Sequence, residues 1–86
     1  MAYVFKRSGI SFINLGIGDV TCEANSVILK IPEGCAPYSF TSILGFVSQN
    51  GESKSYAFYI ANGNLSTDLK LTNAYILVTG IWKSHL

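Results

Sequence analysis

Charged residues are scarce in this 86-residue sequence: Asp, Glu, Lys and Arg make up 13% of it, about half of the roughly 25% typical of soluble domains. The formal net charge is only +1, and the six basic residues are spread thinly along the chain. Binding to the phosphates of nucleic acid depends on clustered Lys and Arg. The sequence therefore predicts no nucleic-acid partner.

Long hydrophobic runs are also lacking. A membrane-spanning helix needs about 20 consecutive apolar residues. The best candidate here, AYILVTGIW at 74–82, contains nine residues, and two of them are Thr79 and Gly80. The opening MAYVFKRSG turns polar at its sixth residue, unlike a secretory signal peptide. We therefore expect no membrane insertion and no secretory leader.

Cysteine and histidine are too few for a metal site. The two cysteines, Cys22 and Cys35, are thirteen positions apart, and His85 is the one histidine. Zinc takes about four protein ligands, or three and a water, so we predict no metal and no other cofactor. The pairing of the two cysteines stays open: they flank one expected strand, but nothing in the sequence indicates the oxidising compartment in which disulfides persist.

Groups that could catalyse a reaction are missing as well. Cys35 could act as a nucleophile only with His85, yet no positive neighbour or helix start activates its thiol. The five carboxylates fall in or beside expected turns, and no two have the spacing of an acid and base acting across a glycosidic bond. We therefore predict that the protein is not an enzyme and has no catalytic residues.

Apolar residues, by contrast, are abundant. They form 49% of the chain, and the mean hydropathy is +0.34. We expect one domain over residues 1–86, and a domain of this size buries only roughly 60% of its unfolded surface. That burial is too small to hide so much apolar area. The excess predicts contacts between copies of the chain, so we expect a homo-oligomer.

Alternation with a period of two dominates the pattern of apolar residues; Tyr56, Phe58 and Ile60, for example, share one face of an expected strand. Turn signals such as Asn-Gly separate these stretches. We predict strands near 2–7, 10–15, 19–23, 26–31, 40–48, 55–61, 64–71 and 74–82. STDLKLTNA could instead begin a helix near residue 66, although its alternating leucines favour a strand. The predicted fold class is all-β, an antiparallel β-sandwich or jelly-roll-like domain.

The strand expected at 74–82 is apolar on both faces. Ala74, Ile76, Val78 and Trp82 occupy one face, and Tyr75, Leu77 and Ile81 occupy the other. An antiparallel strand normally has one polar face, so this strand either lies beneath another layer or contacts a neighbouring subunit. We predict a subunit interface at Tyr75, Ile76, Leu77 and Val78.

Aromatic residues are divided between core and surface. Aromatics at alternate strand positions usually lie in the core, where we expect Phe5, Phe12, Phe46 and Phe58. Trp82 is expected to pack in the closing strand rather than to stack on a sugar. Tyrosine joins an apolar ring to a polar tip, so Tyr38, Tyr59 and Tyr75 are expected at the surface, facing a ligand or another subunit.

The stretch KIPEGCAPYSF, residues 30–40, predicts a rigid corner between strands. Pro32 ends a strand because it has no backbone N–H to donate to a neighbouring strand. Gly34 permits a turn conformation with positive φ, and Pro37 makes the backbone rigid where the next strand begins. The corner is expected to present Tyr38 either to a ligand or to the next subunit.

The order of these features resembles a known family. An N-terminal hairpin AYVFKRSGISFIN leads to a strand running into LKIPEGCAP, then an Asn-Gly turn followed by YAFYIANGNLS, and finally AYILVTGIWKS. This order is similar to that of the distal head domains of bacteriophage receptor-binding proteins, tail fibres and baseplate proteins. Such heads usually follow a shaft, whereas this sequence opens almost directly on its first strand, as an excised head or a separate short protein would.

The resemblance implies a homotrimeric head that binds bacterial cell-surface carbohydrate beside other virion tail proteins. The protein would then lie at a tail-fibre or baseplate tip of the virion, after assembly in the host cytoplasm. Turns at one end of a sandwich can present polar and aromatic groups together, and we predict ligand contacts at Tyr38, Glu52, Asn64 and Asp68. The alternative is a structural trimerisation, decoration or assembly module with no receptor of its own.

Overall fold

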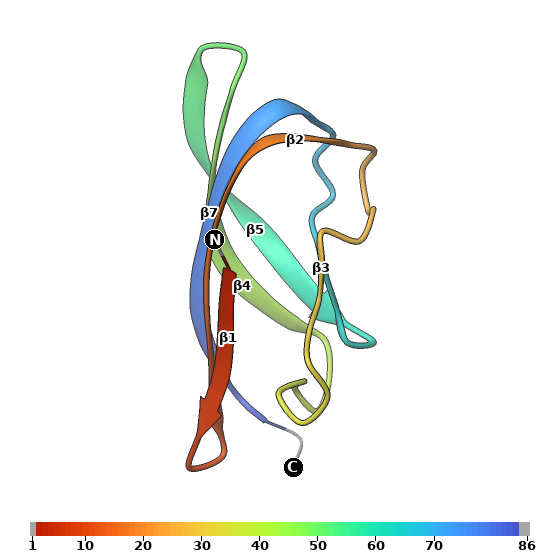
Figure 1. Ribbon diagram of the computed structural model, residues 1–86. Helices are drawn as coiled ribbons and strands as arrows, with labels where there is room; N and C mark the ends of the chain where they lie inside the picture. Colours follow the sequence, from red (N-terminus) through yellow and green to blue (C-terminus); the bar gives the residue numbers. More distant parts are fainter. Residues whose placement is uncertain (1, 85–86) are drawn as a thin grey trace.

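The strands form one antiparallel sheet in the computed structural model, which describes residues 2–84 (Figure 1). Their order across the sheet is β1-β2-β7-β4-β5-β6-β3, and within the described range there is no helix, hence none that could span a membrane. The bounds are β1 Ala2–Arg7, β2 Ile10–Cys22, β3 Leu29–Lys30, β4 Thr41–Gln49, β5 Glu52–Ala61, β6 Asn64–Ser66 and β7 Leu71–Lys83. The predicted all-β class is confirmed.

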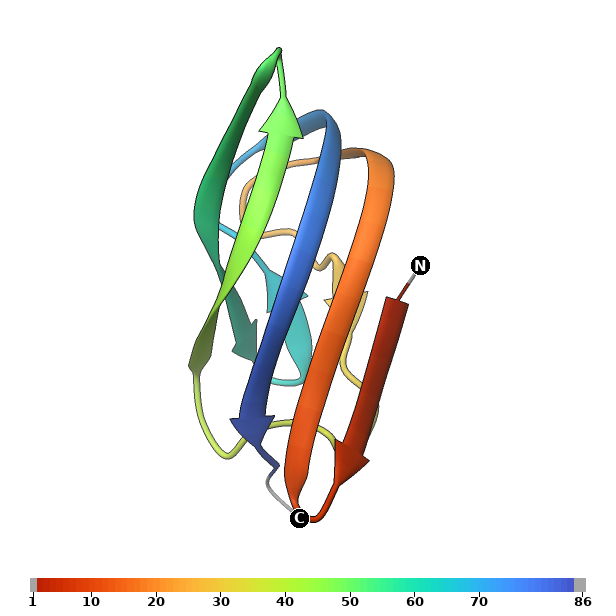
Figure 2. The ribbon, with the colours of Figure 1, turned by 90° about the vertical axis from the view of Figure 1, so that its left-hand side faces the viewer.

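The sheet curls so that its two ends face each other. β1, β2, β7 and β4 run side by side, while β5 twists away from them and carries β6 and β3 to the opposite side of the core (Figures 1 and 2). The core fills the concave side. It contains Ile13, Leu15, Ile31, Ile43, Val47, Phe58, Ile60, Leu65, Leu71, Ala74, Ile76, Val78 and Trp82.

Three tight hairpins set the register of neighbouring strands. Both turn residues have positive φ in Asn50-Gly51 and in Asn62-Gly63, and the same is true of Ser8-Gly9 between β1 and β2. Positive φ at both central positions is the geometry of the type I′ turn, whose twist matches that of the flanking strands. The Asn-Gly hairpins predicted from sequence are therefore present.

The predicted break between the strands expected at 10–15 and 19–23 is wrong. β2 continues from Ile10 to Cys22 and stays paired with β7, with register shifts on either side of Val20. Asp19 in β2 and Asn73 in β7 both have positive φ, and the backbone N–H of Asn73 donates to Thr21 Oγ1 at 2.9 Å. Turn-like residues here produce bulges that bend a continuous strand, rather than a loop.

Two of the predicted strands are much shorter in the structure. The strand expected at 26–31 is reduced to β3, and the strand expected at 64–71 to β6. Isolated backbone hydrogen bonds still hold the intervening segments to each other, including Ile28 N–H to the Leu65 carbonyl at 2.8 Å and Ile31 N–H to the Gly63 carbonyl at 2.7 Å. At this edge of the sheet only a few residue pairs form backbone hydrogen bonds between strands.

Of the four phenylalanines expected in the core, only Phe58 is fully buried. Phe5 is 53% exposed and Phe46 is 42% exposed, and Phe12 is partly buried with its ring stacked on that of Phe5 at 4.9 Å. The expectation is wrong for Phe5, Phe12 and Phe46 because the register places all three on the convex side of the sheet. Alternation predicts which residues share a face, but it does not identify the covered face.

Gly45 is a point of very close packing within the core. It pairs with Tyr56 on β5 and Val78 on β7. The Phe58 ring lies directly over it, so a Cβ built on Gly45 would be 2.2 Å from two ring atoms. The ring therefore occupies the space that any side chain at this position would need.

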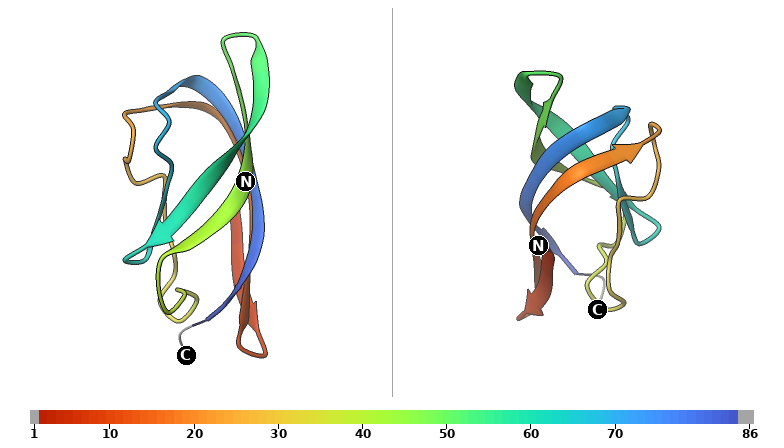
Figure 3. Two further views of the ribbon diagram at one scale, coloured as in Figure 1. Left: turned by 180° about the vertical axis from the view of Figure 1, so that it is seen from behind. Right: turned by 45° about the horizontal axis from the view of Figure 1, so that its top comes forward.

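The segment from Pro32 to Phe40 forms the predicted corner and packs against the end of β7 (Figures 1 and 3). Cys35 N–H donates to the Pro32 carbonyl at 3.0 Å, and Gly34 has a φ of 89°. Trp82 Nε1–H donates to the Cys35 carbonyl at 2.6 Å, and Pro37 forms a β-bridge with Ser84. Trp82 is buried, as expected for a packing residue.

Candidate ligand-binding site

The four residues predicted to contact a ligand do not form one site. Glu52 begins β5, whereas Asn64 follows the turn at its other end, so at about 3.3 Å per residue the two are roughly 30 Å apart. Tyr38 lies on the corner and is 68% exposed, and Asp68 is an exposed residue of the connection between β6 and β7. A shared site for all four would require turns at opposite ends of the molecule to meet.

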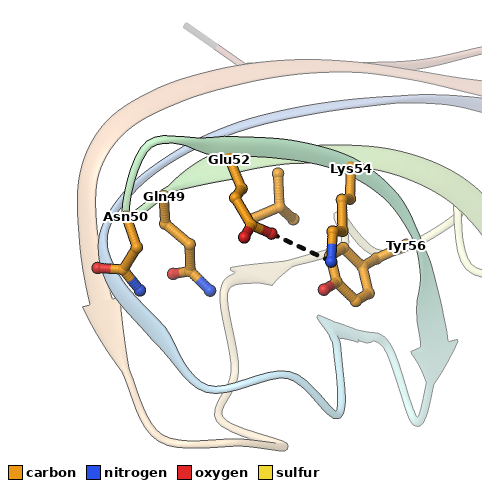
Figure 4. Close-up of a pocket in the computed structure, with 6 residues that line it drawn as sticks. Gln49, Asn50, Glu52, Lys54 and Tyr56 are labelled. Carbon is orange, nitrogen blue, oxygen red and sulfur yellow. Dashed lines mark ion pairs between the residues drawn. The ribbon is translucent and has the colours of Figure 1, made fainter.

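A small polar cleft lies on the concave side of the β4–β5 hairpin, near its tip (Figure 4). Its volume is about 170 Å³, and it includes Glu52 of the predicted set. The residues that line it are Val47, Gln49, Asn50, Glu52, Lys54 and Tyr56. Figure 4 shows these side chains on the same side of the hairpin.

Strand alternation builds this cleft as an extension of the core. Glu52, Lys54 and Tyr56 occupy alternate positions of β5 on the face that also carries the buried Phe58 and Ile60. Toward the hairpin tip no other strand covers this face, and its residues become polar. The half-buried Tyr56 marks the boundary between the apolar core and the polar cleft.

Gln49 is held in place by the segment that crosses beneath the hairpin. Its amide Nε2 donates to the Lys70 carbonyl at 3.3 Å, and its Oε1 accepts from the backbone N–H of Thr72 at 2.9 Å. A side chain that both donates and accepts is fixed in orientation. Gln49 thereby joins the hairpin to the start of β7 and gives one side of the cleft a defined shape.

An ion pair spans the cleft along β5. Lys54 Nζ lies 3.1 Å from Glu52 Oε2, and both side chains are largely exposed (Figure 4). The hydrogen bond from Lys54 to Glu52 and the charge of that carboxylate raise the pKa of Lys54 above its ordinary 10.5, with a smaller contribution from Tyr56. Because the pKa is raised on folding, any stabilisation is complete below about pH 10 and disappears as pH rises through the folded value.

We expect the substitution Glu52→Gln to return the pKa of Lys54 toward 10.5, because it removes the largest influences on that group. The measurement is an NMR titration of the lysine side-chain resonances between pH 8 and 12. Lys83 is exposed at the far end of β7 and serves as the internal control. An unchanged Lys54 titration in the variant would contradict the ion pair.

The cleft can form hydrogen bonds without carrying a net charge. The Glu52 carboxylate and the Lys54 ammonium offset each other, amide groups come from Gln49 and Asn50, and the Tyr56 ring provides a flat apolar surface. Such a combination of polar groups and one aromatic ring suits a neutral, polyhydroxylated ligand. A phosphate or nucleotide would need an excess of positive charge.

The structure separates the two cysteines and provides no metal cluster within residues 2–84. Cys22 pairs with Leu71 at the start of β7, while the Cys35 carbonyl accepts from Trp82 near its end, so the two lie on the order of 30 Å apart along this strand. Both are free thiols. His85, the other member of the conceivable nucleophile pair, lies outside the described residues.

The residues predicted as a subunit interface divide between the two faces of β7. Ile76 and Val78 are completely buried in the core of the single chain. Tyr75 and Leu77 are 47% and 41% exposed on the convex side. A contact with another subunit through this strand would therefore involve Tyr75 and Leu77 directly, with Ile76 and Val78 packing beneath them.

Sequence reasoning missed Gln49, Lys54 and Tyr56 as neighbours of Glu52. The available signal was the alternation Glu52, Lys54, Tyr56 directly after an Asn-Gly turn, which places three functional side chains on one face. Gln49 follows from the hairpin register, because it pairs with Glu52 across the turn. The crossing segment that fixes Gln49 could not be predicted from local pattern.

Comparison with known proteins gives no relative from which a function could be transferred. No family model, no curated protein and no solved structure matches the chain.

Proposed function

We propose that this protein is a non-enzymatic adhesion module that binds a neutral cell-surface saccharide in the β4–β5 hairpin cleft. It would act as a homo-oligomer, with the curled sheet as a sandwich-like head, in the manner of the trimeric bacteriophage receptor-binding heads that its sequence resembles. Its place would then be the tip of a virion tail fibre or baseplate, against a bacterial surface.

The observation that carries the proposal is the charge-balanced cleft beside a half-buried tyrosine ring. Sugars present hydroxyl groups at their edges and apolar C–H faces, which match the hydrogen-bonding groups of Gln49, Glu52 and Lys54 and the ring of Tyr56. A cleft of about 170 Å³ is small, so a single site would bind weakly. An oligomer compensates through avidity, because several weak sites engage one surface together.

The test is a bacterial glycan array probed with the purified protein, followed by titration calorimetry on any saccharide that binds. We expect Tyr56→Ala to weaken binding at least tenfold, because one stacking surface is lost. Tyr59→Ala is the matched control: Tyr59 lies on the opposite face of the same strand and stacks on Phe40 at 5.2 Å. We expect it to leave affinity unchanged.

Two results would count against the cleft. Absence of saccharide binding by the wild-type oligomer, under conditions where a parent particle adsorbs to cells, would favour the structural alternative without its own receptor. Loss of binding in Tyr38→Ala but not in Tyr56→Ala would place the site on the corner instead.

A further inference from the structure

The convex side of the sheet is a broad apolar surface that no segment within residues 2–84 covers. Four strands, β1, β2, β7 and β4, present it side by side (Figure 2). We call this surface the outer face. It is defined by Phe5, Leu44, Phe46, Tyr75, Leu77 and Ile81, whose exposed fractions range from 41% to 66%.

Strand register makes the outer face continuous rather than a scatter of single side chains. Phe5 pairs with Phe12 across β1 and β2, and Phe12 pairs with Ile81 across β2 and β7. Leu77 pairs with Phe46 across β7 and β4. The two clusters are joined through β7, so apolar groups extend across all four strands.

The exposed area is large enough for a stable contact. At about 150–250 Å² for each large side chain, half exposed, the six residues present on the order of 600 Å². Exposed Tyr3 and the small polar residues between them bring the outer face close to the about 800 Å² that each partner buries in a standard interface. Patches of this size on soluble proteins usually mark an interaction site.

The outer face also has two hollows into which side chains of another sheet could pack. One hollow of about 460 Å³ lies between Phe5, Phe12 and Ile81, and another of about 240 Å³ lies between Leu44, Phe46 and Leu77. Leu44 and Ile81 project beside these hollows and are 66% and 64% exposed. Two sheets that pack face to face interlock projecting side chains of one into gaps of the other.

The charge on this surface indicates what covers it. The outward-facing positions of the four strands carry apolar or small neutral side chains along most of their length. The charged exceptions lie toward the ends of the sheet: Arg7 and Lys83 flank Ile10 at one end, and Asp19 lies in the bulge of β2 toward the other. A charged partner would lose solvation without gaining ion pairs, whereas another copy of this chain brings an equally uncharged surface.

We infer that the outer face is the subunit interface of a homo-oligomer, packed against the outer faces of the other copies of this chain around a common axis. This inference deepens the oligomeric part of the proposed function and requires no ligand. Tyr75 and Leu77 take part in the contact, and the apolar second face of β7 is thereby covered. The hairpin cleft opens on the concave side and stays accessible in the assembly.

The test is the mass of the protein in solution, measured by analytical ultracentrifugation between 1 and 200 µM. We expect the wild type to have a multiple of the 9.3 kDa chain mass. Ile81→Glu and Leu44→Glu, tested separately, should each weaken association on the order of 100-fold or more, since each places an unpaired carboxylate in the contact. Both side chains are mostly exposed in the single chain, so the monomer should keep its fold, as checked by circular dichroism.

Val27→Glu is the matched control, because Val27 is 58% exposed in the loop before β3, away from the outer face. It adds the same charge and should leave the mass unchanged. A wild type that is monomeric at 200 µM would overturn the inference. So would an oligomer that survives both outer-face variants, or one that only the control disrupts. Retained saccharide binding by a monomeric variant would separate assembly from the ligand site.

Discussion

The substitution Gly45→Ala is expected to lower the free energy of unfolding by about 2–3 kcal/mol, a large effect for a single added methyl group. The new Cβ would lie 2.2 Å from two atoms of the Phe58 ring, where no carbon contact is possible. Phe58 is fully buried and cannot swing into solvent. Either the ring must leave its rotamer, or β4 must separate from its neighbours.

The measurement is chemical denaturation at a fixed protein concentration, supported by the thermal midpoint, which should fall by about 10 °C or more. Gly18→Ala is the matched control. A Cβ there would be 3.6 Å from Tyr75 Cδ2, an ordinary contact, and Gly18 does not have positive φ. The double variant Gly45→Ala with Phe58→Leu should lose less free energy of unfolding than the sum of the losses in the two single variants, because leucine is smaller than phenylalanine and leaves room for the new Cβ. Equal stability of both glycine variants would contradict the close packing.

Trp82→Ala is expected to destabilise the protein by about 3–5 kcal/mol, the usual cost of removing a large buried aromatic side chain. The loss would have two sources. The ring fills the end of the core, and its Nε1–H is the donor to the Cys35 carbonyl at 2.6 Å that ties the corner to β7. The free energy of unfolding, measured by denaturation, tests the size of the effect.

Trp82→Phe separates these two sources, because it keeps an aromatic ring but loses the donor. We expect a smaller loss of about 1–3 kcal/mol from the unsatisfied carbonyl. In this variant, hydrogen exchange should accelerate at the Cys35 amide, which donates to Pro32 within the corner. Exchange in the paired centre of β2 and β7 should change much less. If Cys35 exchange is unaffected, the indole hydrogen bond does not hold the corner.

The parts of the fold that follow from local chemistry could be predicted from the sequence. Asn50-Gly51 and Asn62-Gly63 specify tight hairpins through positive φ, and the alternation in β4, β5 and β7 is regular enough to identify strands and their faces. The proline corner likewise follows from Pro32 and Gly34. Each of these features depends on only a few neighbouring residues.

Features that depend on distant partners could not be predicted. Residues 16–19 have the composition of a turn, yet pairing with β7 makes them part of one bulged strand. Phe5 and Phe46 alternate like core residues, but among the described residues no second layer covers their side of the sheet. In both cases the local structure depends on segments that are distant in the sequence, and the local pattern does not show where those segments lie.

In the candidate site, too, some features follow from local sequence and others depend on distant segments. Glu52 was predicted because it follows a turn, and its neighbours on the same face were available from alternation. Tyr38, Asn64 and Asp68 were predicted for the same reason, but turns at opposite ends of the molecule look alike in sequence. Only the three-dimensional arrangement shows that the crossing segment at Lys70 and Thr72 orders Gln49 beside Glu52.

The position of β7 has a consequence for how the chain folds. β7 is the last strand in the sequence, yet it lies between β2 and β4, so Leu15 pairs with Val78, 63 residues further along. The β1–β2 and β4–β5 hairpins can form from local contacts, but each keeps an unpaired inner edge until β7 has been synthesised. Closure of such long loops is slow, and exposed edges invite association between chains. Insertion of β7 is therefore expected to be the slow step of folding, and it protects β2 and β4 from edge-to-edge association with other chains.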